Sequence, residues 1–311
     1  MRKVEIELMT VTPLFLGGSD PHGQPPELRP PSFRGAMRYW YRAALGGVVG
    51  DTNLDAVRKM EAAVFGSTDT GSPVSLRLSG DLKHSQHPLL PHKQGGRGSR
   101  NAFDAGQKFT LTMTAGPACS DLVWVNACMA LNLALTLGGI GLRSRRGMGS
   151  LQVLGSAQPD LVPVFPQQFE ELKKFIQKIT RSAVRQVETL AAGLNIPTAG
   201  LPQSPTAFPC ASLGAEFRLV RGVRANRPLE AVAELMRRFP KAAWLGGISP
   251  RQSSPVWARV FKTTEGYHLF FTLLPSKLAQ NTHDYRKVKE WLDHSVLGDQ
   301  IEVKGWNKNE A

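Results

Sequence analysis

Residues 138–150 read GGIGLRSRRGMGS, and this stretch decides how the rest of the chain is interpreted. It holds five glycines and three arginines and no acidic residue. An apolar run at 122–137, long enough for a helix, precedes it, and residues 151–154 alternate like a short strand after it. Glycine lets the backbone approach a ligand closely, and arginine offers a planar, charged fork that suits phosphate. We therefore predict a loop that binds a polyanion.

The loop does not match the familiar nucleotide-binding patterns. A P-loop follows a strand, opens a helix and ends in Gly-Lys-Ser/Thr, whereas this loop follows a helix, precedes a strand and has no lysine. Gly139 and Gly141 do not complete a dinucleotide fingerprint, because Ser144 stands at the place of the third glycine. A longer polyanion is favoured over a single nucleotide. The alternative is a flexible hairpin with solvated arginines, but crowding three like charges is costly without a counter-charge.

The distribution of charge also indicates a polyanionic partner. The formal net charge is +13. Asp and Glu are absent from four windows that each carry several Arg, Lys or His residues, at 28–50, 82–103, 122–159 and 235–264. Acidic residues gather instead at 51–69 and in the helical stretch at 169–188. Such uneven charge predicts a basic face or groove that binds nucleic acid or an acidic surface.

Other features bear on location and cofactors. No apolar run reaches the roughly 18 residues that span a bilayer, and the N-terminus alternates like a strand rather than reading as a signal peptide. Cys119, Cys128 and Cys210 lack metal-ligand spacing and are typical of free thiols in a reducing cytoplasm. We expect a cytoplasmic protein with no cofactor, no membrane contact and no small-molecule substrate.

The first half has the element order β-α-β-β-α-β. Its expected elements are a strand at 4–15, helices at 32–45 and 54–64, strands at 74–78 and 109–114, a helix at 122–137 and a strand at 151–154. This is the ferredoxin-like arrangement. RNA-recognition modules share it, but their RNP aromatic motifs are missing here.

The second half repeats that order in degenerate form after a connecting helix and a linker at 194–213. Its expected elements are a strand at 216–220, a helix at 228–239, a hairpin of 256–262 and 267–274, a helix at 284–296 and a strand at 301–304. We therefore predict an α+β chain of two tandem ferredoxin-like domains, at 1–158 and 159–311.

The helix expected at 32–45 carries a stripe of arginines. Arg34, Arg38 and Arg42 follow one another at helical spacing, and Trp40 belongs to the apolar face. Charged stripes usually face solvent. No Glu or Asp stands four residues away to pair with these arginines, which favours a ligand-binding role.

Three histidines stand in the acid-free window at 82–103. His84, His87 and His92 could indicate a metal or acid–base catalysis, but zinc ligands occur in tighter pairings and this segment is rich in Pro and Gly. We predict a mobile basic loop that closes over nucleic acid, with Lys93 and Arg97 in contact with it.

Several segments together resemble one family. Leu16-Gly-Gly-Ser-Asp, Leu28-Arg-Pro-Pro-Ser-Phe-Arg-Gly-Ala-Met-Arg-Tyr-Trp-Tyr-Arg, Glu61-Ala-Ala-Val-Phe-Gly-Ser and the glycine-rich loop are similar to motifs of the first RAMP subunit of Cmr-type (type III-B) CRISPR effector complexes, within the RAMP superfamily. Arg251-Gln-Ser-Ser-Pro resembles a basic segment of the same family. The resemblance is strong in the first half and loose in the second.

The resemblance implies a non-catalytic subunit of an RNA-guided antiviral effector. Its members lie near the 3′ region of the guide RNA and help to engage the guide–target duplex beside other RAMP subunits. The expected partners are therefore the guide (CRISPR) RNA, the target RNA and those subunits. The residues expected to contact RNA are Arg34, Arg38, Arg42, Lys93, Arg97, Gly139, Gly141, Arg143, Ser144, Arg145, Arg146, Gly147 and Arg251.

Two other functions remain open from the sequence. A metal-independent, guide-processing endoribonuclease would use a histidine as general base or acid, and His84, His87 or His92 would serve. A structural adaptor would use the positive charge to bind an acidic neighbouring subunit. A two-metal nuclease is disfavoured, because the basic windows hold no carboxylates.

Overall fold

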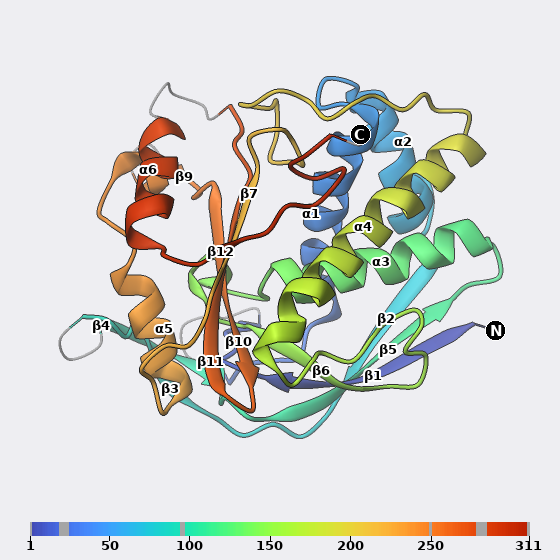
Figure 1. The fold of residues 1–311 in the computed structure, drawn as a ribbon. Coiled ribbons are helices and arrows are strands. Elements are labelled where there is room, and N and C mark those ends of the chain that lie inside the picture. Colours follow the sequence, from blue (N-terminus) through green and yellow to red (C-terminus); the bar gives the residue numbers. More distant parts are fainter. Residues whose placement is uncertain (1, 19–24, 94–96, 249–250, 278–284, 310–311) are drawn as a thin grey trace.

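The computed structural model describes residues 2–18, 25–93, 97–248, 251–277 and 285–309. The first half forms a four-stranded antiparallel sheet in the order β2-β5-β1-β6, with α1 and α3 over one face (Figure 1). A further helix, α2, packs on α1. The elements of this half are β1 (Lys3–Thr10), α1 (Pro30–Val49), α2 (Leu54–Phe65), β2 (Val74–Ser79), β3 (His84–Leu90), β4 (Arg97–Phe103), β5 (Lys108–Ala115), α3 (Asp121–Leu137), η1 (Ser144–Arg146) and β6 (Leu151–Ser156).

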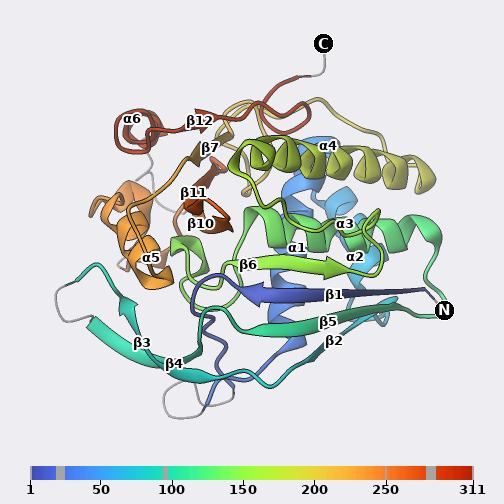
Figure 2. The ribbon, with the colours of Figure 1, turned by 60° about the horizontal axis from the view of Figure 1, so that its bottom comes forward.

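Local sequence explains these bounds. Strand β1 alternates exposed and buried residues, as a half-buried strand does, and it ends at Thr10, short of the expected Phe15, with Pro13 three residues beyond. Helix α1 begins on two prolines, which suit the first turn. Helix α3 is apolar on nearly all sides because it lies between the sheet and α4 (Figure 2).

The second half begins with α4 and then forms a second four-stranded antiparallel sheet, in the order β10-β11-β7-β12. Counted within each half, both sheets run 4-1-3-2, so the expected order of elements is confirmed. The last strand lies slightly earlier than expected. The elements are α4 (Phe169–Gly193), β7 (Glu216–Val220), α5 (Pro228–Arg237), η2 (Ala243–Leu245), β8 (Gly247–Ile248), β9 (Arg251–Gln252), β10 (Val256–Thr263), β11 (Gly266–Leu273), α6 (Tyr285–Ser295) and β12 (Asp299–Gln300).

The two halves share one core. Strands β10 and β11 are buried along almost their whole length, so both faces of the second sheet are covered. Helices α5 and α6 lie on one side of it and the first half lies on the other (Figure 1). Phe217 and Trp306 belong to the same hydrophobic cluster as β1 and α1. Helix α4, expected in the second domain, packs on α1 and α3.

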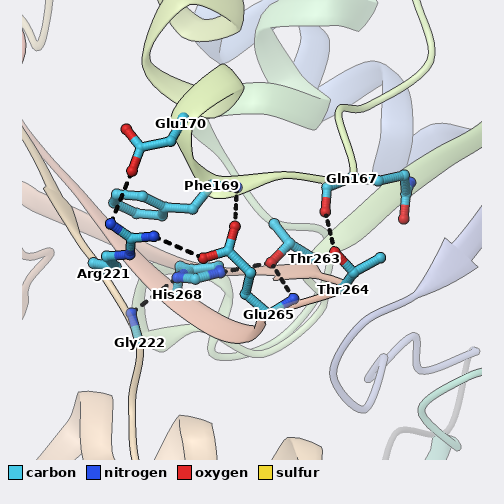
Figure 3. Close-up of polar contacts among 9 residues, drawn as sticks. All are labelled: Gln167, Phe169, Glu170, Arg221, Gly222, Thr263, Thr264, Glu265 and His268. Carbon is cyan, nitrogen blue, oxygen red and sulfur yellow. Dashed lines mark hydrogen bonds and ion pairs between the residues drawn. The ribbon is translucent and has the colours of Figure 1, made fainter.

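The N-terminus of α4 is fixed to the turn between β10 and β11 (Figure 3). The Glu265 carboxylate accepts the Phe169 N–H at 2.9 Å, which satisfies a donor of the first helical turn. Arg221 joins Glu265 at 2.9 Å and Glu170 at 2.8 Å. The orientation of α4 is therefore set by contacts with the second sheet as well as by packing on the first half.

A buried histidine lies beside that junction (Figure 3). His268 Nδ1 accepts the Gly222 N–H at 2.9 Å, and Nε2 lies 2.7 Å from the Thr263 hydroxyl oxygen. An acceptor at Nδ1 assigns the ring proton to Nε2. Burial lowers the pKa of His268, so the neutral ring is the form that fits.

The segment at 82–103 is a hairpin and not the loop predicted. Strands β3 and β4 pair antiparallel from His84–Phe103 to Leu90–Arg97. Phe103 also exchanges backbone hydrogen bonds with Leu14, and Ala102 and Phe103 are buried. The sequence does not predict this hairpin because its strands lack regular apolar alternation, and the contact that holds it in place is with Leu14, a distant part of the chain.

None of the helices in the described ranges combines the length and apolar composition that crossing a bilayer requires.

Candidate nucleic-acid interface

The glycine-rich loop is folded tightly against the segment that follows β1. Leu142 N–H donates to the Phe15 carbonyl at 3.0 Å, and Gly149 N–H donates to the Pro13 carbonyl at 2.9 Å. Gly141 and Gly149 have φ of 83° and 63°, and a Cβ atom on them would lie 2.1 and 1.9 Å from a backbone oxygen. These two positions require glycine because no side chain fits there.

The other predicted loop positions are largely inside the protein. Gly139 and Gly147 are buried, and the Gly147 carbonyl accepts the hydroxyls of Thr12 at 2.7 Å and Ser150 at 3.0 Å. Ser144 opens η1 and is half-buried. The loop is thus a well-packed structural element, and its surface for a ligand is limited to what remains exposed.

Arg145 and Arg146, which the sequence predicted to contact RNA, have partners inside the protein. The Arg145 guanidinium lies 4.4 Å from the centre of the Trp257 ring and donates to the Ser254 carbonyl. Arg146 lies 3.8 Å from the centre of the Phe239 ring, and burial followed by the two neighbouring arginines lowers its pKa to about 9. Aromatic faces and carbonyls replace the missing counter-charge, and no acidic residue is needed.

Arg143 differs from both. It is exposed, with a left-handed backbone conformation at φ 62°, and its side chain has no hydrogen-bond or ion-pair partner among the described residues. His92 and Lys93, after β3, and Arg237, at the end of α5, lie near enough to act on one another: burial, together with Lys93, Arg237 and Arg143, lowers the pKa of His92. Three segments distant in sequence therefore bring positive charge to one place.

Two hollows flank this place. One, of about 680 Å³, lies between the β3–β4 hairpin and α5. Its lining includes Lys93 and Arg237, together with Arg227 and Glu230, which pair with each other. Figure 2 shows the hairpin running beneath α5. The other, of about 280 Å³, lies beside Gly141 and Leu142 and is lined also by Phe15, Gly17, Ser32 and Arg100. We call the surface around the two hollows the basic groove. It is defined by Lys93 and Arg237 of the first hollow, Arg100 of the second, and Arg143, whose charge acts on His92.

Arg100 and Arg237 were missed at the sequence level. Both stand in windows without acidic residues, and this was the one sequence feature that could have indicated them, because no local motif includes them. Arg237 is also paired with Glu234 at 2.6 Å. Lys93, Arg100 and Arg143 have no carboxylate partner within the part of the chain that the structure describes.

The arginine stripe of α1 is paired, contrary to the reasoning that favoured it. Arg38 and Arg42 lie 2.5 and 3.4 Å from the Glu61 carboxylate, which comes from α2. Arg34 donates to the Val74 carbonyl at 3.3 Å. Helix α2 flanks α1 on the side away from α5 (Figure 1), so the stripe and the basic groove are separate surfaces. A partner on another helix is invisible to an i±4 rule.

The remaining predicted positions are two arginines, for RNA binding, and the histidines of the β3–β4 hairpin, for catalysis. Arg97 and Arg251 begin β4 and β9, but their side chains lie outside the described residues. His87 Nε2 lies 2.7 Å from Asp104 and 3.1 Å from the Ser85 hydroxyl, and His84 is exposed on β3. Across the described ranges, no group of three or more His, Cys, Asp or Glu residues could hold a metal ion.

Comparisons with known proteins agree with this architecture. Residues 7–152 match the RAMP superfamily. The first half of the chain is therefore similar to RAMP superfamily domains. The "CRISPR system Cmr subunit Cmr1-2" of Pyrococcus furiosus is 28% identical over 185 residues, which are 49% of this chain and 96% of that protein. Cmr1-1 of the same organism is 28% identical over 171 residues, 50% of this chain and 49% of that protein.

The fold extends this likeness to the second half. The crystal structure of apo Cmr1 from P. furiosus aligns with a TM-score of 0.66 and 19% identity over 98% of this chain and 100% of that one. A chain of the type III-B Cmr-β complex bound to cognate target RNA aligns with a TM-score of 0.63 and 13% identity over 95% of this chain and 99% of that one. The whole chain is therefore an α+β protein with a Cmr1-like fold.

Proposed function

We propose that this chain is an RNA-binding subunit of a type III-B CRISPR effector complex. The observation that carries the proposal is that Lys93, Arg100 and Arg143 lie around two hollows of a Cmr1-like fold and have no acidic partner among the described residues. Similar chains occur in the Cmr system and in a Cmr complex bound to target RNA. We interpret the two halves as tandem ferredoxin-like domains with the groove built where they meet.

The groove suits the backbone of RNA. Exposed guanidinium and ammonium groups attract phosphate without reading base sequence. Contacts of this kind would hold the 3′ region of a guide RNA and the guide–target duplex, beside other RAMP subunits, by shape and charge.

We further propose that the chain does not cleave RNA. The endoribonuclease alternative would need a histidine free to move a proton at a 2′-hydroxyl. His87 is committed to Asp104 and Ser85 within the hairpin, and His84 is on the exposed face of β3. His92 is the histidine best placed for the groove, and we assign it to binding.

The experiment measures binding and cleavage together. Wild type, K93Q/R100Q/R143Q and the matched control R58Q/K59Q/K262Q, which loses the same charge at exposed positions elsewhere, are titrated with labelled single-stranded repeat RNA, with and without a chelator. The proposal predicts weaker binding by the groove variant alone and intact RNA throughout. Equal affinities for wild type and groove variant would refute the groove. Specific products that H92A or H87A abolishes would establish the ribonuclease. If the groove variant bound RNA as wild type does but no longer bound an acidic neighbouring subunit, the adaptor function would be supported.

A further inference from the structure

Helix α4 carries a second basic surface that the sequence had led us to regard as acidic. Lys174, Lys178, Arg181 and Arg185 are exposed and line a shallow hollow of about 520 Å³. They stand at i, i+4, i+7 and i+11, which places them on one face of the helix. We call this set the α4 stripe.

The stripe has no internal counter-charge. None of its four cations forms an ion pair with a carboxylate of the described residues. Glu170, one turn before Lys174, is bound instead to Arg221, while Glu171 and Glu188 flank the stripe. This is the reverse of α1, where Glu61 pairs with two arginines. Two pairs of like charges at i, i+4 weaken a helix, so the arrangement leaves a cost that an anionic ligand would remove.

The stripe is rigid and far from the basic groove. The opposite face of α4, including Leu172, Ile176 and Ile179, is buried against the rest of the protein. The Glu265 and Arg221 contacts at the N-terminus of α4 fix it further (Figure 3). Figure 2 shows α4 above α1 and α3, while the β3–β4 hairpin lies on the other side of the molecule beneath α5. A ligand segment in the groove would not lie on the stripe.

We infer that the α4 stripe is a second contact for the sugar–phosphate backbone of RNA. From Lys174 to Arg185 the helix rises about 16 Å at ~1.5 Å per residue. That length corresponds to about five nucleotides of one helical strand, whose charges repeat every ~3.4 Å along the axis. This inference goes beyond the groove and rests only on RNA being the ligand of the chain.

The surroundings of the stripe favour nucleic acid over an acidic protein. The residues between its cations are polar, namely Gln177, Ser182 and Gln186. Stable protein interfaces bury a core that is apolar and depleted in charge, and the lining of this hollow offers no apolar side chain. Phosphate contacts need only exposed cations in a line.

The test compares two variants of the full chain that lose the same net charge. K174Q/K178Q/R181Q/R185Q removes the stripe, and R58Q/K59Q/K108Q/K262Q removes four exposed cations elsewhere; glutamine is nearly as good a helix former as the residues it replaces. The Kd for a 40-nucleotide single-stranded RNA is measured between about 50 and 200 mM salt. Four lost contacts would reduce the salt slope by about 3, so the affinity of wild type would fall about fifty-fold more than that of the stripe variant over this range.

Crosslinking makes the outcome specific to the site. RNA containing 4-thiouridine is crosslinked, and bound peptides are identified; the inference predicts crosslinks within 173–188 in wild type and their loss in the stripe variant. The inference would be overturned if the stripe variant kept the salt slope of the matched control and wild type gave no crosslinks within 173–188. Binding of polyglutamate but not of RNA at the stripe would also overturn it. The groove variant K93Q/R100Q/R143Q separates the two proposals. Its failure to weaken binding would count against the groove and would leave the stripe standing.

Discussion

The glycine-rich loop provides a sharp test because its arginines differ in exposure and in contacts. Arg143 is exposed and unpaired among the described residues, whereas Arg145 stacks on Trp257 at 4.4 Å and on Tyr39 at 5.2 Å. We predict that R145A unfolds more easily and that R143A does not.

The magnitude follows from the contacts that each substitution removes. A cation over an aromatic face that is shielded from water contributes about 2 kcal/mol, and the hydrogen bond from Arg145 to the Ser254 carbonyl adds to it. The gain is offset in part by the cost of burying the guanidinium. We expect R145A to lower the free energy of unfolding by about 2–3 kcal/mol. R143A removes no contact and should change it by less than about 0.5 kcal/mol.

Equilibrium unfolding in urea, followed by tryptophan fluorescence and by circular dichroism, measures both variants. R145K adds a control: it keeps the charge but loses the planar stacking of the guanidinium, so it should be destabilised nearly as much as R145A. Coinciding transitions by the two probes would justify the two-state treatment. The reasoning fails if R143A is as destabilised as R145A, or if R145A unfolds at the urea concentration of wild type.

Three further predictions concern stability. Arg259 is fully buried. Its Nη2 donates to the Leu151 carbonyl and its guanidinium lies 4.1 Å from the centre of the Phe261 ring, but Nε and Nη1 have no partner among the described residues. We expect the cost of burying this charge to exceed those contacts, so R259M should raise the free energy of unfolding by about 1 kcal/mol, and a loss in urea unfolding would contradict this. G149A places Cβ 1.9 Å from a carbonyl oxygen at φ 63° and should lower the free energy of unfolding by about 3 kcal/mol or more. G35A, which has open space around it in α1, should be neutral or stabilising, and thermal unfolding of both variants measures the difference. Because the folded pKa of His268 is lowered, the unfolded chain binds its proton first, so stability should fall as pH drops below about 6.5; H268Q should flatten that slope, and an unchanged slope would argue against it.

Local pattern was enough for most of the fold. Alternation in β1 and the long apolar run of α3 are signals within one element. The order of elements then agrees with the 4-1-3-2 strand order that each sheet adopts. The place of the glycine-rich loop, between α3 and β6, was predicted for the same reason. Its helical turn, Ser144–Arg146, was not.

The missed features all depend on contacts between distant residues. Glu61 neutralises Arg38 across two helices, and Trp257 stacks on Arg145 from the other half of the chain. The β3–β4 hairpin has little alternation of its own and is anchored through Phe103. Arg237 reaches the groove only because α5 lies over the hairpin. Composition marked the windows that hold these residues, but only the fold decides which side chains meet.

The central claim is that the basic groove grips RNA through Lys93, Arg100 and Arg143. The most direct measurement is the salt dependence of single-stranded RNA binding by wild type, by K93Q/R100Q/R143Q and by the matched control R58Q/K59Q/K262Q. Three lost phosphate contacts should reduce the slope of log K against log salt by about 2 in the groove variant, and the control should keep the slope of wild type. Identical slopes for all three proteins, with the groove variant folded, would contradict the account.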